Sequence, residues 1–163
     1  MPTPSSVARA LLCPVPCGHM DDALLTFNAQ KRVAFGSDRE EMFYDPIAGK
    51  QRLPKGTHVL IFVSQTGDRD GAAKRHNVGR IAYDATYLGW ERANNQGKHR
   101  EPIFRPASAH ETDTEVRGFW EVSNLRRLPH PLTLSALRTH MTNGKVIASP
   151  RRPMFVNDMV ISP

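Results

Sequence analysis

The sequence predicts a mainly β (α+β) domain, a small barrel with short helical insertions. The chain has 163 residues, which is the length of one ordinary domain. Its apolar residues come in five or six short runs separated by turn residues, as is typical of short strands. Thirteen scattered prolines disfavour long helices. The chain has no strand–helix alternation and no Gly-x-Gly-x-x-Gly motif, so a Rossmann fold is excluded.

The first residues differ in composition from the rest of the chain. We expect residues 1–20, which include four prolines, to form a flexible extension, and residues 21–163 to form a single domain. Cys13, Cys17 and His19 offer three zinc ligands, whereas a structural zinc site takes four, so we expect a solvent-facing thiol pair. The extension lacks the long apolar stretch of a signal peptide, and two cysteines are too few for a disulfide scaffold. A reducing cytoplasm is the expected compartment.

The elements of the domain follow in order. Residues 23–27 and 33–35 have strand character, and Ser37 with Glu40 predicts the start of a short helical turn. The clearest strand covers residues 58–63, which are apolar on both faces and therefore belong at the centre of a sheet. A polar loop at residues 64–74 is followed by strands at 77–83 and 86–90 and by a basic loop at 94–106. The last elements are a strand at residues 118–122, a helical turn at 133–138 and an extended tail at 151–157.

The charge balance favours a polyanionic partner. The chain has 22 Lys and Arg against 16 Asp and Glu, a formal net charge of +6. Positive charge raises the affinity for phosphate backbones, because bound phosphates release condensed counterions. No stretch approaches the roughly 20 apolar residues of a membrane span, so we expect nucleic acid rather than a membrane as the partner.

Aromatic and basic residues cluster in the second half of the chain. A flipped base needs an aromatic face for stacking, polar groups at its edge, and cations for the flanking phosphates. Tyr83, Tyr87 and Trp90 offer the aromatic faces, although the same rings can equally fill the core of a small barrel. The phosphate-binding candidates are Lys98, Arg100, Arg105, Arg151 and Arg152, for which the alternative is a solvated basic surface.

Two blocks of the sequence resemble the EVE domains of the PUA-like superfamily. The first runs LPKGTHVLIFVS over residues 53–64 and is followed by the glycine-containing strand VGRIAY at residues 78–83. The second runs FWEV at residues 119–122, with Leu125 and Leu128, and then PLTLSAL at residues 131–137. The order of elements is similar from Leu24 to Phe155.

The resemblance implies a curved sheet closed into a pseudobarrel, with a concave pocket for a nucleobase, often a modified one. It implies a reader of modified DNA or RNA rather than a catalyst. It adds Ser64, which ends the strand near the pocket, and Trp120 to the base-binding candidates. The chain departs from the family pattern at Thr57, where an acidic residue is usual, at Phe62 and Val63, and in its opening strand, which lacks the usual tryptophan.

Two other functions are compatible with the sequence. A hydrolase or nuclease would place Asp68 and Asp70 of the loop at residues 67–71, with Glu91, around a divalent ion. A triad of Ser64 with a histidine and one of those aspartates has no nucleophile-elbow motif to support it. A module for a small ligand or a protein is the third possibility. We expect no cofactor, since no phosphate-binding P-loop is present.

Overall fold

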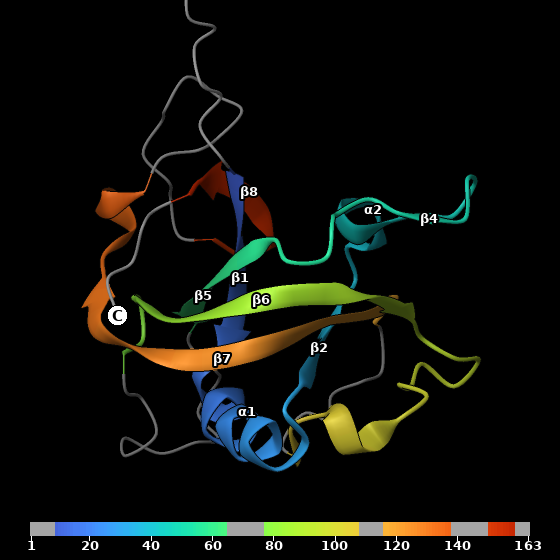
Figure 1. The fold of residues 1–163 in the computed structure, drawn as a ribbon, viewed down its shortest axis with the longest axis horizontal. Coiled ribbons are helices and arrows are strands. Elements are labelled where there is room, and N and C mark those ends of the chain that lie inside the picture. Colours follow the sequence, from blue (N-terminus) through green and yellow to red (C-terminus); the bar gives the residue numbers. More distant parts are fainter. Residues whose placement is uncertain (1–8, 65–76, 108–115, 138–149, 159–163) are drawn as a thin grey trace, which may run out of the picture.

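The fold is built on a mixed sheet of six strands. A computed structural model describes residues 9–64, 77–107, 116–137 and 150–158. In spatial order the strands are β2 (Val33–Ser37), β7 (Gly118–Leu132), β6 (Ile81–Arg92), β5 (His58–Ser64), β1 (Arg9–Pro16) and β8 (Met154–Asn157) (Figure 1). Neighbouring strands are antiparallel, apart from β1 and β5, which are parallel. The predicted mainly β class is confirmed. In the described part of the chain the sheet is open, with β2 and β8 at its edges, and no closed barrel is seen.

The prediction of a flexible extension is wrong for residues 9–20. Residues 9–16 form β1, which lies between β5 and β8, and Ala10, Leu11, Leu12 and Cys13 are fully buried. Leu12 is the last residue of β1 that pairs with β8, so the prolines at 14 and 16 lie where none of the described strands pairs with β1 on that side. The predicted solvent-facing thiols are also wrong, since both cysteines are buried.

The strand predicted at residues 23–27 is wrong as well, because these residues lie in the helix α1 (Cys17–Gln30). Cys17, Met20 and Ala23 recur every three residues and are buried against the sheet. The helix ends at Lys31, which adopts a left-handed conformation with φ of 62° and donates its N–H to the carbonyl of Phe27. In Figure 1, α1 lies below β7 and next to β2.

Most other predicted elements are confirmed. Residues 58–63 belong to β5, a central strand, and residues 81–83 and 86–90 are parts of the single strand β6, which is paired with β7. The helical turn predicted after Ser37 is α2 (Glu40–Phe43). The remaining short elements are β3 (Tyr44–Asp45), β4 (Lys50–Gln51) and the 3-10 turns η3 (Pro102–Phe104) and η5 (Leu134–Ala136). The hairpin of β3 and β4 projects from the sheet beside α2 (Figure 1).

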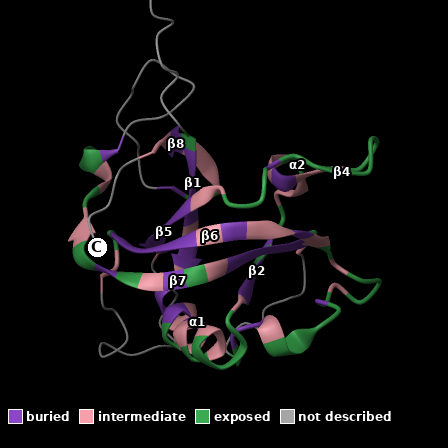
Figure 2. Ribbon diagram, viewed as in Figure 1, coloured by how far each residue is buried: buried purple, intermediate pink, exposed green. Residues whose placement is uncertain are grey.

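Both faces of the sheet are covered, which explains the doubly apolar central strand. Leu11, Cys13 and Val15 of β1 point into a larger cluster that includes α1, whereas Ala10 and Leu12 point into a smaller cluster with Leu137 and Val156. Figure 2 shows buried residues along the middle of the sheet. No helix in the described ranges is long and apolar enough to cross a membrane.

Candidate functional site

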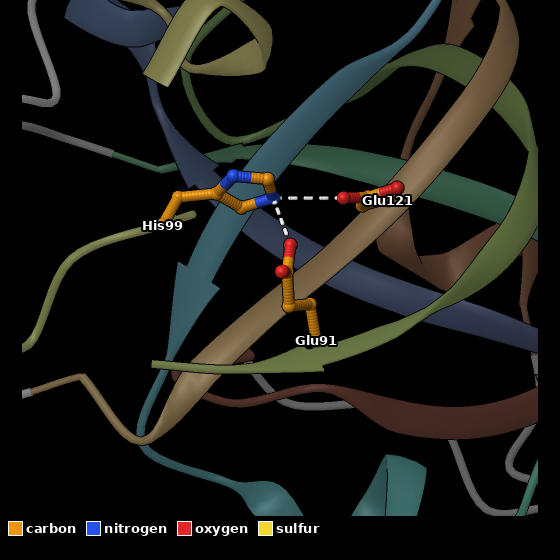
Figure 3. Close-up of side chains that lie close together, drawn as sticks. All are labelled: Glu91, His99 and Glu121. Atoms are coloured by element: carbon orange, nitrogen blue, oxygen red, sulfur yellow. Dashed lines mark hydrogen bonds and ion pairs between the residues drawn. The ribbon is translucent and has the colours of Figure 1, made fainter. Parts of the chain in front are cut away.

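Glu91, His99 and Glu121 meet at the end of the β6–β7 pair (Figure 3). The Nε2 atom of His99 lies 2.7 Å from Oε2 of Glu91 and 2.7 Å from Oε1 of Glu121. The imidazole is almost completely buried, and Glu121 is buried too, whereas Glu91 is partly exposed. These contacts join two neighbouring strands to a loop that follows β6.

The pairing of β6 with β7 brings the two carboxylates together. Gly89 pairs with Glu121, and Glu91 pairs with Phe119, so both carboxylates point to the same face of the sheet. Trp90 pairs with Trp120, and both rings therefore point to the opposite face. Because Gly89 has no side chain, the space beside Glu121 is left open.

A tight turn after β6 returns the chain so that His99 reaches the carboxylates. Asn94 holds this turn: its Oδ1 accepts hydrogen bonds from the N–H groups of Gln96 and Lys98, and its own N–H donates to the carbonyl of Lys98. Gly97 adopts a φ of 73°, which favours glycine. The imidazole then packs edge-on against Phe119, with 5.0 Å between the ring centroids.

The hydrogen bond at the other ring nitrogen assigns the tautomer of His99. The backbone N–H of Glu101 donates to Nδ1 over 2.8 Å, so Nδ1 carries a lone pair and the proton is on Nε2. A metal ion held by this histidine and the two carboxylates would need the lone pair of Nε2. It would therefore require the opposite tautomer and the loss of the Glu101 hydrogen bond. The described arrangement suits a hydrogen-bonded ionic cluster better than a metal centre.

Two arginines balance the charge of the carboxylates. Arg32 forms an ion pair with Glu121, and Nε of Arg100 lies 3.3 Å from Oε1 of Glu91. Burial by itself raises the pKa of Glu121, but the hydrogen bond from His99 and the charge of Arg32 outweigh it, and the pKa lies below the ordinary 4.5. Glu121 is therefore ionised at neutral pH.

An open cavity of about 410 Å³ borders the cluster, a volume within the usual range of ligand sites. Its walls carry three arginines, two carboxylates and two aromatic residues: Arg32, Arg92, Arg100, Glu91, Glu121, Tyr44 and Trp90, together with Gly89. The cavity thus combines hydrogen-bond donors, hydrogen-bond acceptors and aromatic surface.

The β3–β4 hairpin closes one side of this cavity. The amide side chain of Gln51 bonds the backbone of Trp90 twice, because Nε2 donates to the Trp90 carbonyl and Oε1 accepts the Trp90 N–H, each over 2.9 Å. β6 runs past His58, the first residue of β5, and there the Gln51 amide takes the place of a neighbouring strand. Arg92 bonds Glu40 of α2 over 3.0 Å and lies over the ring of Tyr44. These contacts hold Tyr44 at the cavity wall.

The structure places the predicted aromatic residues in the core. Tyr83, Tyr87, Trp90 and Trp120 are all buried in the larger apolar cluster, and Trp120 stacks on Phe35 at 4.5 Å between centroids. Of these four residues, Trp90 also borders the cavity. The structure therefore favours the core alternative for the other three.

Ser64 does not lie in the same site as Trp90. Val63, next to Ser64, bonds Arg80 just before the start of β6, whereas Trp90 lies ten residues farther along the strand. At about 3.3 Å per residue this separates the two residues by roughly 30 Å. The prediction that Ser64 reads the edge of a base stacked on Trp90 is therefore wrong.

The predicted phosphate-binding residues do not form one surface. Arg100 lines the cavity, and Lys98 is exposed on the same loop. Arg105 is buried, donates to the carbonyl of Ala34 over 2.6 Å and lies over the ring of Phe119, so its role here is structural. Arg151 and Arg152 are exposed, but they precede β8, at the sheet edge opposite β2.

The acidic loop at residues 67–71 lies outside the described residues, and the nuclease alternative stays a prediction. His58, the described histidine of the possible triad, contacts Asp158 at 2.6 Å and Asp84 at 3.1 Å. It starts β5 and Ser64 ends it, so this histidine and serine do not meet.

Reasoning from sequence missed Arg32, Tyr44 and Glu121 and considered Glu91 only as a possible ligand of a divalent ion, whereas Arg92 and His99 belong to the cluster of aromatic and basic residues between Tyr83 and Arg105 that it singled out. Two signals in the sequence pointed to the site. A glutamate occurs in each of the two aromatic strands, directly after Trp90 and Trp120, and an imidazole follows the Asn-Asn-Gln-Gly turn.

Comparison with family models, with curated proteins and with solved structures gives no match for this chain.

Proposed function

We propose that this chain is a nucleic-acid-binding module that receives a nucleobase in the cavity beside Glu91, His99 and Glu121, and the resemblance to EVE domains favours a modified base. The cavity supports this proposal because it has polar groups of both kinds at its wall. Nε of Arg32, a residue of the cavity wall, is a buried donor that meets no acceptor in the ranges that the structure describes. The edge of a nucleobase offers both acceptors and donors.

The positions of the arginines support a phosphate contact at the mouth of the cavity. The side chains of Arg92 and Arg100 are 59% and 80% exposed, so most of each guanidinium group is free to approach a ligand while it holds its carboxylate partner. Guanidinium groups bind phosphate oxygens through paired N–H groups. The net charge of +6 favours the same class of ligand.

The observation that carries the proposal is the presence of exposed arginines, the buried unpaired Nε donor of Arg32 and carboxylate acceptors around one cavity of nucleobase-compatible size. A module that binds a free small ligand would need the same cavity, but it would use the exposed arginines only to contact a single anionic group of that ligand.

Fluorescence polarisation with labelled single-stranded and duplex oligonucleotides tests the proposal. We expect binding at low salt that weakens several-fold in Arg92→Ala and in Arg100→Ala, with the log–log salt slope reduced by about 0.7–0.9 for each lost phosphate contact. Arg80→Ala is the matched control, because Arg80 is exposed and precedes the opposite end of β6. Absence of binding at low salt, or equal losses in all three variants, would refute the proposal.

A further inference from the structure

The cluster of Glu91, His99 and Glu121 has fewer hydrogen-bond donors than acceptors. His99 carries one proton on Nε2, since Nδ1 accepts the Glu101 N–H, yet Oε2 of Glu91 and Oε1 of Glu121 both lie 2.7 Å from that nitrogen. One N–H group cannot give a full, straight hydrogen bond to two oxygens at once. Among the described residues, these two oxygen atoms therefore share one N–H group and retain the capacity to accept another hydrogen bond.

The remaining donors are already engaged with the other oxygen atoms. Arg32 bonds Oε2 of Glu121, and Arg100 bonds Oε1 of Glu91. A carboxylate oxygen accepts two hydrogen bonds, so the atoms that face His99 can each accept one more. Glu121 is buried and Glu91 is partly exposed, and both carboxylates border the open cavity, from which a ligand could donate to them.

We infer that the Glu91–Glu121 pair recognises an amino group of the ligand. This rests on the proposed function and specifies its ligand: a nucleobase with an exocyclic amino group, that is adenine, cytosine or guanine. An amino group has two N–H donors and can serve one oxygen of each carboxylate. Thymine and uracil present carbonyl oxygens at the corresponding edge positions, and a carbonyl oxygen facing two carboxylates is repelled.

The preference should be large, because a site built to bond a polar group discriminates strongly against an analogue that lacks it. The two charged acceptors also make the interaction stronger than one between neutral groups. A base without its amino group would leave the two carboxylates with only the donors of His99, Arg32 and Arg100 among the described residues.

The test compares oligonucleotides that differ by one amino group. We would measure polarisation with a central adenine against purine, a central cytosine against 2-pyrimidinone, and a central guanine against hypoxanthine, in an otherwise constant sequence. At least one of the three pairs should show an affinity ratio of about ten or more in favour of the amino base. In Glu91→Gln this ratio should fall to near one, because the variant replaces an acceptor oxygen by a donor.

Glu101→Gln is the matched control. It removes the same charge one residue from Arg100, its side chain is exposed, and its backbone N–H to His99 is retained. The amino-group ratio should be unchanged in this variant. Thermal melts of both variants show whether the fold is intact, and Glu91 is the better of the two carboxylates to replace because it is the more exposed.

The outcomes separate this inference from the proposed function. Equal affinity for amino and deamino bases, with binding that still depends on Arg92 and Arg100, overturns the amino-group selection and leaves the proposed function standing. Absence of arginine-dependent binding overturns both. A rise in melting temperature with Zn²⁺ or Mn²⁺ that Glu91→Gln abolishes would also overturn the inference, since it would make the cluster a cation site.

Discussion

The indole of Trp90 lies parallel to the ring of Phe43, with 4.9 Å between the ring centroids and 4° between their planes. Phe43, the last residue of α2, is fully buried and also stacks on Tyr87 at 6.0 Å. The stack joins α2 to β6 directly behind the cavity wall. Trp90 therefore supports the shape of the site from the core side.

Replacement of Trp90 by alanine should destabilise the protein by about 3–5 kcal/mol, the usual cost of removing a large buried aromatic ring. Urea unfolding followed by circular dichroism measures this cost. Arg100→Ala is the comparison, and because its side chain is 80% exposed we expect almost no change in stability. A Trp90→Ala variant as stable as the unchanged protein would contradict the core role of the ring.

Gly118 allows the close contact between β7 and the end of β6. A Cβ atom at this position would lie 2.5 Å from the carbonyl oxygen of Glu91 and 2.5 Å from the ring of Trp90. We expect Gly118→Ala to cost about 1–3 kcal/mol or more, since neither backbone nor packed ring can move freely.

Gly89→Ala is the control for that prediction. A Cβ atom at Gly89 would meet only the side-chain oxygen of Gln51, at 4.0 Å, so thermal melting should change little. Equal destabilisation by the two alanines would show that the effect comes from glycine replacement in these strands in general, and not from contact with Trp90 and Glu91.

The sequence could predict those strands whose apolar residues follow a clear pattern. Residues 59–63 are apolar at every position, and this is what a strand covered on both faces requires. The same reasoning failed for β1, because prolines dominate its flanks and conceal four fully buried positions. Whether a proline-rich segment is an extension or a strand depends on which partner strand is available, and that partner here lies about fifty residues away.

The candidate site was harder to predict than the fold, for a related reason. Glu91 and Glu121 lie thirty residues apart in the sequence, and only the register of β6 against β7 shows that they share a face. This register includes shifts between Tyr87 and Gly89, which no local pattern reveals. The aromatic neighbours were visible in the sequence, but the choice between core and pocket depended on the same alternation.

If β1 is an integral strand, replacement of Leu11 should be as costly as any core truncation. Leu11 is fully buried and pairs with Val59 of β5. Leu11→Ala should lose about 2–5 kcal/mol in urea unfolding. Leu25 of α1 is 67% exposed, so Leu25→Ala should change the free energy of unfolding very little. A flexible extension would instead make the Leu11 variant as stable as the Leu25 variant.

The ionic cluster predicts a loss of stability in acid. Because the pKa of Glu121 is below 4.5 in the folded protein, the unfolded chain takes up this proton at a higher pH than the folded chain does. The stabilisation by ionised Glu121 is therefore complete above about pH 4.5 and is lost as the pH falls through the lowered folded value. Unfolding free energies measured by urea titration between pH 7 and pH 3 should show this decline.

Glu121→Gln identifies the residue responsible for the decline. The variant cannot titrate at this position, so it should be less stable than the unchanged protein at neutral pH, and the difference should shrink as the pH falls below 4.5. Glu101→Gln removes an exposed carboxylate and should keep a small, constant difference over the same range. A difference for Glu121→Gln that stays constant down to pH 3 would mean that Glu121 has the same pKa in the folded and unfolded chains, and that His99 and Arg32 do not stabilise its charge.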